Sequence, residues 1–260
     1  MKIVILGAGK MGMFMADTLC VNHDVAVYAR HADRLRYCLN VRRFLSMEEI
    51  RDFDPDLLIN CVTIKNTFSA FNQVLPYLSP KCMLSDIASV KTGLPEFYQS
   101  CGHPYVSTHP MFGPTFANLS DLSQNSTVII KESDPQGKEF FREVYASLKL
   151  NICDYTFEEH DEAIAYSLSI PFVSTLAFTG VMKPQEAPGT TFKRHMAIAR
   201  GLLSEDDFLL TGILFNPNTA KQIDKICERL HDLSDIIKQH DAERLLNHIN
   251  ECRENIKDQH

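Results

Sequence analysis

Short apolar runs alternate with helical periodicity over the first 155 residues. The runs that predict strands are Lys2 to Leu6, Asp24 to Ala29, Asp56 to Ile64, Cys82 to Ile87, Tyr105 to Thr108, Ser126 to Lys131 and Asn151 to Tyr155. A run without polar positions, such as 56–64, suits a parallel strand buried on both faces. Because helical patterns separate most of these runs, the sequence predicts an α/β fold with a Rossmann-type doubly wound parallel sheet.

Strand signals end after Thr156, and the rest of the chain has helical periodicity. One long apolar helix is predicted over 158–180, and a second helical stretch over 192–215. A later helix repeats apolar residues at three- and four-residue steps, which predicts a buried face. Those residues are Ile223, Ile226, Leu230, Leu233 and Ile237. The pattern therefore predicts a dinucleotide-binding domain at 1–155 and an all-α domain at 156–260.

Composition narrows the classes of partner. The 260 residues carry a formal net charge of -7, which disfavours nucleic acid and acidic membranes because phosphates repel an acidic chain. A small anionic ligand would need a local cationic pocket. The apolar run at the N-terminus is too short to predict a signal peptide, and no apolar stretch is expected to approach the ~20 residues of a membrane span.

The spacing of the cysteines and histidines predicts neither a disulfide framework nor a metal site. Eight cysteines occur without a C-x-x-C pair, which favours reduced thiols in a cytoplasmic protein. The histidines show no metal-ligand spacing, so no metal site is predicted.

The stretch Gly7-Ala-Gly9-Lys-Met-Gly12 fits G-x-G-x-x-G. It follows a predicted strand and opens a predicted helix, which is the context that a dinucleotide site requires. The glycines would let the backbone approach a pyrophosphate at the helix N-terminus. The alternative is a glycine turn without a ligand. The cofactor-binding residues that we expect are Gly7, Gly9, Lys10, Met11, Gly12, Arg30, Thr63 and Ser89.

The end of the second strand bears on the cofactor. An NAD site usually places a carboxylate here to bind the ribose, and this chain has Ala29 followed by Arg30. An arginine without that carboxylate suits the 2′-phosphate of NADP, and Arg34 lies close in sequence. NADP is therefore favoured and NAD remains possible. The alternative is that Arg30 is a solvated surface charge.

Four further motifs carry a resemblance to a known family. They are ASVKTG at 88–93, THPMFGP at 108–114, EEHDEAIAYSLSIPF at 158–172 and MAIARGLLSEDDFLLTGI at 196–213. With the glycine loop, they make nearly the whole chain resemble the prephenate/arogenate dehydrogenase family of tyrosine biosynthesis. The resemblance implies oxidative decarboxylation of prephenate to 4-hydroxyphenylpyruvate, with hydride transfer to NAD(P). Arogenate dehydrogenase is the alternative, and a non-catalytic NADP-binding sensor is a more distant one.

The resemblance implies that His109 and Ser89 are catalytic. His109 would accept the proton of the substrate's ring hydroxyl, a role that suits imidazole because it titrates near neutral pH. Ser89 would bond near that hydroxyl and the nicotinamide, and would help to hold the imidazole. The alternatives are a histidine that caps a proline turn and a turn serine.

Substrate binding is implied for the second domain. Arg200 matches the position at which the family's arginine grips the ring carboxylate, and Lys193 and Arg194 add positive charge nearby. The alternative for Arg200 is a helix-surface arginine. Phe172 departs from the family, because many relatives have histidine there. We interpret His160 and Asp161 mainly as the start of the long helix, where an acidic residue is favourable.

The family also implies an assembly. The all-α domain would form a homodimer with a second copy, and the active site would lie between the two domains. The two predicted domains use up the 260 residues, so we expect no separate regulatory domain.

Overall fold

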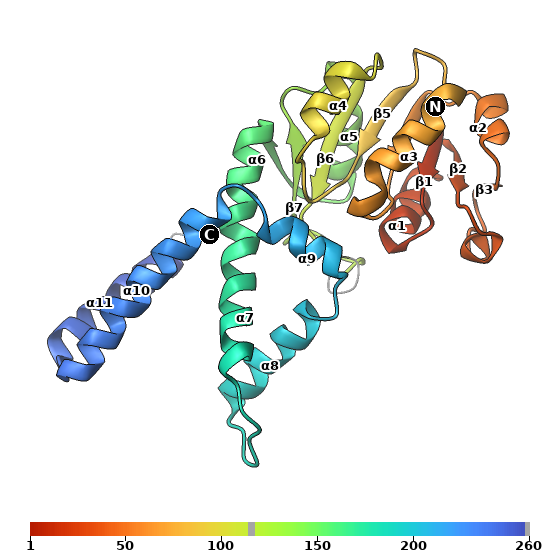
Figure 1. Cartoon of the computed structure of the whole chain (residues 1–260). Coiled ribbons are helices and arrows are strands. Elements are labelled where there is room, and N and C mark those ends of the chain that lie inside the picture. The colour runs from red at the N-terminus through yellow and green to blue at the C-terminus, as the bar shows by residue number, and fades with distance from the viewer. Residues whose placement is uncertain (114–117, 258–260) are drawn as a thin grey trace.

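A single eight-stranded sheet organises the first part of the molecule in this computed structural model, which describes residues 1–113 and 118–257 (Figure 1). Its order is β3-β2-β1-β4-β5-β6-β7-β8. The strands are β1 (Lys2–Leu6), β2 (Asp24–Tyr28), β3 (Arg42–Phe44), β4 (Leu57–Asn60), β5 (Met83–Asp86), β6 (Tyr105–Pro110), β7 (Ser126–Ile130) and β8 (Asn151–Tyr155). The order reverses between β1 and β4, and open α/β sheets bind ligands at such a switch point.

The sheet departs from the prediction at one pair of strands. Strands β1 to β6 are parallel, as expected, and β8 is parallel to β7. Strand β7, however, is antiparallel to β6, with His109 opposite Val128. Parallel neighbours need a crossover, usually a helix, and the described residues between β6 and β7 contain none. The fold is thus a Rossmann-type, mostly parallel sheet.

Helices cover both faces of the sheet. They are α1 (Lys10–Leu19), α2 (Met47–Phe53), α3 (Thr67–Val74), α4 (Leu94–Ser100) and α5 (Pro135–Ser147). Within β1, Ile3 and Ile5 belong to one apolar cluster and Val4 and Leu6 to the other. A strand buried on both faces explains the uninterrupted apolar runs and confirms the doubly wound arrangement.

The elements of the region 31–53 were predicted poorly from the sequence. The helix expected near 31–39 is only a 3-10 turn, η1 (Ala32–Leu35), and β3 and α2 were missed. Strand β3 has one buried residue, Phe44, because it lies at the edge of the sheet. Arg42 of β3 instead pairs with Asp24 on the surface, so this strand lacks an apolar run.

The C-terminal part contains only helices among its described elements. Helix α6 (Phe157–Ile164), five π-helical residues η4 (Ala165–Ser169) and α7 (Ile170–Val181) form the long helix that was predicted. The remaining helices are α8 (Thr190–Leu202), α9 (Asp207–Leu214), α10 (Thr219–Gln239) and α11 (Ala242–Lys257). The single helical stretch expected at 192–215 is broken because the Asp206 carboxylate caps a new helix by accepting from the amides of Phe208 and Leu209.

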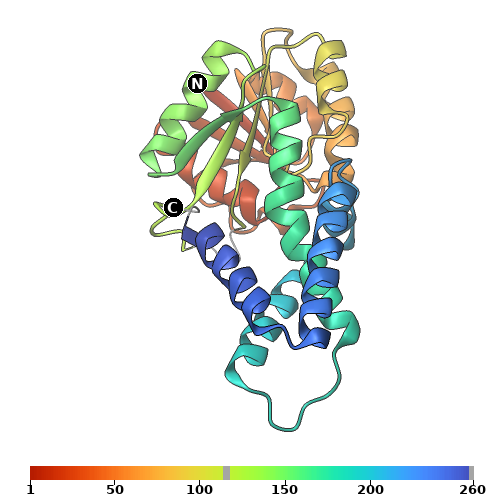
Figure 2. The same ribbon diagram turned by 90° about the vertical axis from the view of Figure 1, so that its left-hand side faces the viewer.

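The helical part leaves much apolar surface open. Figures 1 and 2 show α7, α10 and α11 extending away from the sheet. The prediction that this face of α10 is buried is wrong for the single chain, because Leu230 and Ile237 are each 56% exposed. The last strand ends at Tyr155 and α6 begins at Phe157, and whether 1–155 and 156–260 fold as separate units stays a prediction.

The long helix also corrects the expectation about membrane spans. The helix Phe157–Val181 is 25 residues long and contains an 18-residue window with a mean hydropathy of 1.5, which is enough by length and composition to cross a bilayer. Only 17% of its apolar window is buried within the chain. A helix that packs against a protein partner passes the same test, so this property alone does not distinguish the two environments.

Candidate active site

The glycine loop between β1 and α1 has the geometry of a phosphate cradle. Gly7 has φ +101°, a conformation that favours glycine, and a Cβ there would lie 3.1 Å from the Cys61 carbonyl oxygen. A Cβ on Gly12 would lie 2.0 Å from the Gly7 carbonyl oxygen, so only glycine fits. A Cβ on Gly9 would meet nothing within 4 Å. The open side at Gly9 fits the approach of a dinucleotide pyrophosphate.

A cavity of about 350 Å³ lies next to this loop, at the carboxyl ends of β1, β2 and β4. Of the cofactor residues expected from sequence, Gly7, Gly9, Arg30 and Thr63 line it. Lys10, Met11, Gly12 and Ser89 are not among its lining residues. The lining residues that sequence reasoning missed include Tyr28, His31, Asn66 and Gln73.

The side chains that line the cavity carry positive charge. Arg30 and Arg34 both line it, and none of its described lining residues is acidic. Arg30 directly follows the end of β2, where the ribose of a bound dinucleotide is expected. The cavity can therefore hold a dinucleotide and offers two cations to an additional phosphate.

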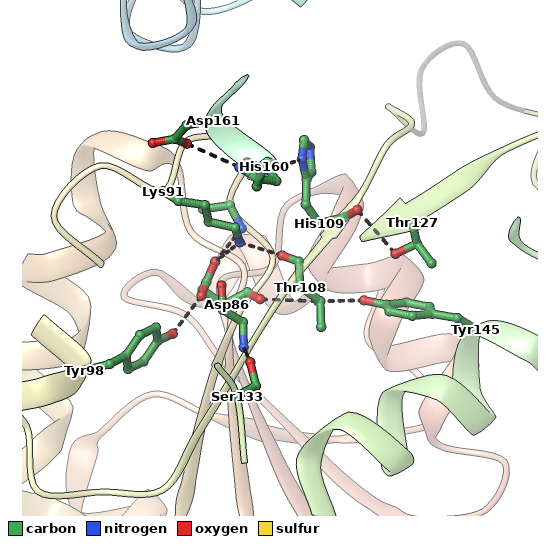
Figure 3. A network of polar contacts seen from close by, with 12 residues as sticks. Asp86, Lys91, Tyr98, Thr108, His109, Thr127, Ser133, Tyr145, His160 and Asp161 are labelled. Atoms are coloured by element: carbon green, nitrogen blue, oxygen red, sulfur yellow. Dashed lines mark hydrogen bonds and ion pairs between the residues drawn. The ribbon is translucent and has the colours of Figure 1, made fainter. Parts of the chain in front are cut away.

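His109 lies near the carboxyl end of β6. Since β6 runs parallel to β5, β4 and β1, His109 stands at the same edge of the sheet as the cofactor cavity. The residue is 6% exposed, and its Nδ1 lies 3.0 Å from Nε2 of His160 (Figure 3). The Thr127 hydroxyl donates to the His109 carbonyl at 3.3 Å, which ties the strand to β7.

His160 reaches this site from α6. A capping box between Thr156 and Glu159 fixes the first turn of that helix, and His160 follows it with no exposed surface. Its Nδ1 lies 3.3 Å from Asp161 Oδ1, and the Asn216 amide donates to the Asp161 carbonyl at 2.8 Å. His160 was therefore more than a helix start, and the adjacent His-Asp pair was the signal in the sequence.

A buried ion pair between Asp86 and Lys91 helps to hold the site in place. Asp86, at the end of β5, and Lys91 both have fully buried side chains, and the Lys91 ammonium binds Asp86 Oδ1. Lys91 also donates to the Thr108 carbonyl at 2.7 Å, and the Tyr98 hydroxyl donates to Asp86 Oδ2 at 2.7 Å (Figure 3). These bonds fix the loop that carries Ser89. Lys91 belongs to the ASVKTG motif, yet no role was predicted for it or for Asp86.

Burial sets the protonation of the two histidines. It lowers the pKa of His109 well below its ordinary value, and repulsion from Lys91, and from His160 whenever that ring is protonated, lowers it further. Burial also lowers the pKa of His160, although Asp161 opposes that effect. Both imidazoles are therefore neutral near pH 7, and a neutral imidazole can accept a proton.

Comparison with known proteins gives the family. The family model of the prephenate dehydrogenase nucleotide-binding domain matches residues 24–152. A probable arogenate/prephenate dehydrogenase of Methanocaldococcus jannaschii is 24% identical over 204 residues, 72% of this chain. The chain belongs to the prephenate/arogenate dehydrogenase family. It spans 45% of the length of that relative, so it corresponds to about half of it.

Solved structures of the family have the same fold as this chain. Prephenate dehydrogenase of Aquifex aeolicus, in complex with hydroxyphenyl propionate and NAD+, superposes with a TM-score of 0.84 at 18% identity, covering 99% of this chain and 97% of that one. Synechocystis arogenate dehydrogenase gives 0.75 at 19% identity, covering 98% and 100%. The similarity extends over both the sheet and the helices.

Ser89, which was predicted to be catalytic, makes no contact with His109 through a hydrogen bond among the described residues. It is half-buried in the loop between β5 and α4, and its hydroxyl has no hydrogen-bond partner within the described chain. The hydrogen bond that orients the His109 ring comes instead from His160. Ser89 is therefore free to bind a ligand, and its catalytic role stays a prediction. Pro114, the last residue of the THPMFGP motif, lies outside the described residues.

The predicted substrate cations are not gathered around His109 in the single chain. Arg200, Lys193 and Arg194 are exposed on α8, and α8 packs on α7, as the contact between Phe178 and Phe192 shows. Within the described part of the chain, no hydrogen bond or ion pair holds the Arg200 guanidinium. The substrate-binding role of these three residues stays a prediction.

Proposed function

We propose that this chain is a prephenate dehydrogenase, which oxidises prephenate to 4-hydroxyphenylpyruvate and carbon dioxide, with arogenate as the alternative substrate. The observation that carries the proposal is His109, a buried neutral imidazole at the same sheet edge as the cofactor cavity. Family membership supports the same reaction. The nicotinamide, when bound, supplies the acceptor for the substrate's hydride.

The proton balance explains why a base is needed. In the proposed reaction, the carbon that bears the ring hydroxyl loses hydride, the hydroxyl loses its proton, and the bond to the ring carboxylate breaks to give carbon dioxide. Aromatisation drives these changes. His109 takes up the hydroxyl proton, which a group titrating near neutral pH does efficiently, and returns it to the phenolate oxygen once carbon dioxide has left. Its burial keeps water away from the reacting atoms.

NADP is the preferred cofactor in this proposal, and NAD is the alternative. Support comes from Arg30 and Arg34 in the cavity and from the absence of acidic side chains among its described lining residues. Two guanidinium groups would bind the 2′-phosphate that distinguishes NADP from NAD.

The active assembly is proposed to be a homodimer in the cytoplasm. Its support is the apolar surface of the helices, which includes Leu230, Ile237 and Leu246, each more than half exposed. Large exposed apolar patches mark interaction sites. In such a dimer Arg200, Lys193 and Arg194 would bind the carboxylates of the substrate. Membrane attachment through Phe157–Val181 is the competing explanation, and extraction without detergent as a dimer would exclude it.

The testing experiment combines two substrates with two cofactors. Purified protein is mixed with prephenate or arogenate and with NADP or NAD, and reduced nicotinamide is followed by absorbance. Turnover with prephenate and NADP is expected to be fastest. Turnover with arogenate alone would assign the alternative substrate. Cofactor binding without turnover of either substrate would contradict the proposal and would favour a sensor.

A further inference from the structure

Asp161, His160 and His109 form a chain of side chains whose last member is the proposed base (Figure 3). Asp161 Oδ1 lies 3.3 Å from His160 Nδ1, and His160 Nε2 lies 3.0 Å from His109 Nδ1. The two imidazole rings meet at 61° with centroids 5.2 Å apart, so they interact edge to face and do not stack. The contact between them is therefore a ring-nitrogen hydrogen bond.

The direction of each hydrogen bond follows from the donor inventory. The Asp161 side chain is 26% exposed, and a carboxylate can only accept a hydrogen bond. His160 Nδ1 must therefore carry the proton of that bond. A neutral imidazole has one donor and one acceptor, so His160 Nε2 accepts. The partner nitrogen, His109 Nδ1, must then donate.

We propose that His160, oriented by Asp161, is a positioning residue that holds His109 as the tautomer with its proton on Nδ1 and its lone pair on Nε2. The proposal rests on the proposed function for the role of His109 as the base. During reaction the substrate's proton adds to His109 Nε2, and His109 becomes the imidazolium. The Nδ1 proton stays in place, His160 stays neutral, and no proton reaches Asp161.

The charges around the pair show why Asp161 is needed. From the β5–α4 side, Asp86 and Lys91 face the site, and their ammonium and carboxylate bind each other. Lys91 lies close enough to oppose a positive charge on either histidine. The carboxylate of Asp161 is the negative charge in direct contact with His160, so it stabilises the imidazolium through that ring.

The tautomer can be read without any substrate. We would label the histidines with 15N and record the imidazole nitrogen shifts at neutral pH, and identify His109 by the signals that the His109→Asn variant lacks. The expected result is His109 protonated at Nδ1. In Asp161→Asn, the new amide can donate to His160 Nδ1, which reverses both bonds and moves the His109 proton to Nε2. His109 protonated at Nε2 in the unmodified protein would overturn the proposal.

Kinetics give the second readout. Asp161→Asn is expected to lower kcat by about 10²- to 10⁴-fold with little change in KM, as when another histidine base is held in the wrong tautomer. Glu162→Gln removes a carboxylate from the next, exposed position of the same helix and should leave kcat unchanged. A kcat loss in Asp161→Asn without a tautomer change would mean a merely structural role and would contradict the proposal.

The His160 variants separate positioning from packing. The side-chain oxygen of His160→Gln can still accept from His109 Nδ1, whereas His160→Leu cannot. His160→Gln should keep the Nδ1-protonated tautomer and retain at least tenfold more kcat than His160→Leu. Equal losses in both variants would overturn the inference. If the unmodified protein turns over neither substrate, the proposed function fails, while the nitrogen shifts still decide this inference.

Discussion

The two halves of the molecule differ in which groups they bury and which they expose to water. At the sheet edge, charged and polar groups are buried against partners, and Lys91, His109 and His160 all lie below 9% exposure. In the helices, apolar groups remain open to solvent, and Phe215 and Val181 are 83% and 80% exposed. A buried charge is tolerated only with a partner, and an exposed apolar face is a cost until something covers it. The sheet half therefore pairs its buried charges within one chain, and we call it the complete half, whereas the helical half leaves apolar surface uncovered, and we call it the open half.

The buried ion pair gives the sharpest test of the complete half. Asp86→Asn would leave the fully buried Lys91 ammonium without its counter-charge, while the new amide still fits beside Tyr98. Removing one member of a buried pair costs about 3–5 kcal/mol of unfolding free energy, and we expect a loss in that range. Denaturant titration measures it.

A matched pair on the surface is the control for that measurement. Asp24 and Arg42 are bonded at 2.8 Å with side chains 43% and 58% exposed. Asp24→Asn should cost at most about 1 kcal/mol. Similar losses in the two variants would mean that the Lys91–Asp86 pair is not buried as the fold places it.

The open half is tested by charging its exposed face. The double change Leu230→Glu and Ile237→Glu places two carboxylates on α10 where the side chains are exposed in the single chain. A dimer that covers this face should weaken by at least 100-fold, which light scattering over a concentration series measures. The unfolding free energy of the single chain should change by about 0.5 kcal/mol or less.

The control for the α10 change is a charge on a helix face that is already polar. Lys225→Glu alters an exposed position of the same helix and should leave the dimer intact. A protein that is monomeric before any change, or that requires detergent for extraction, would contradict the idea that a second copy covers the helices.

Lowering the pH should reduce the unfolding free energy of the complete half. Burial lowers the pKa values of His109 and His160, so the unfolded chain binds more protons than the folded one below the ordinary histidine pKa of 6.5. Stability is then present above pH 6.5 and falls as the pH drops through it, by about 1.4 kcal/mol per pH unit for each histidine. Urea titrations from pH 7.5 to 5 should show this slope. His160→Gln should reduce it, and an unchanged slope in that variant would refute the assignment.

The smallest expected effect concerns cofactor choice. Arg30→Gln removes one of two cavity guanidinium groups, so the Kd for NADP should rise about tenfold, a typical value for a charged hydrogen bond, while the Kd for NAD stays within twofold. Fluorescence titration measures both constants. Arg36→Gln alters a nearby exposed arginine outside the cavity lining and serves as the control.

Sequence patterns predicted those parts of the fold whose cause is local. Uniform apolar runs and the glycine loop gave the parallel strands and the cofactor cradle, because burial on both faces and close backbone approach restrict residue type at each position. Strand β3 was missed because edge strands need no apolar run. Strand β7 was predicted, but its antiparallel direction was missed because the direction of a strand is set by its connection.

The site was predicted only in part for a similar reason. His109 stood out through its motif, but its partner His160 is 51 residues away and reaches it only through the packing of α6 on the sheet. The Lys91–Asp86 pair was not predicted, because nothing in the sequence pattern indicates that a lysine in a loop and an aspartate at a strand end are buried together. On α10 the opposite error occurred, since a periodic apolar face predicts burial without saying whether the same chain or another one covers it.

The most direct test of the account compares the unmodified protein with His109→Asn in two measurements on the same preparation. The account predicts that NADP binding is unchanged, because the cofactor cavity does not include His109, while turnover with the preferred substrate falls by at least about 10³-fold. Turnover within tenfold of the unmodified protein, with cofactor binding intact, would show that His109 is not the base and would contradict the central claim.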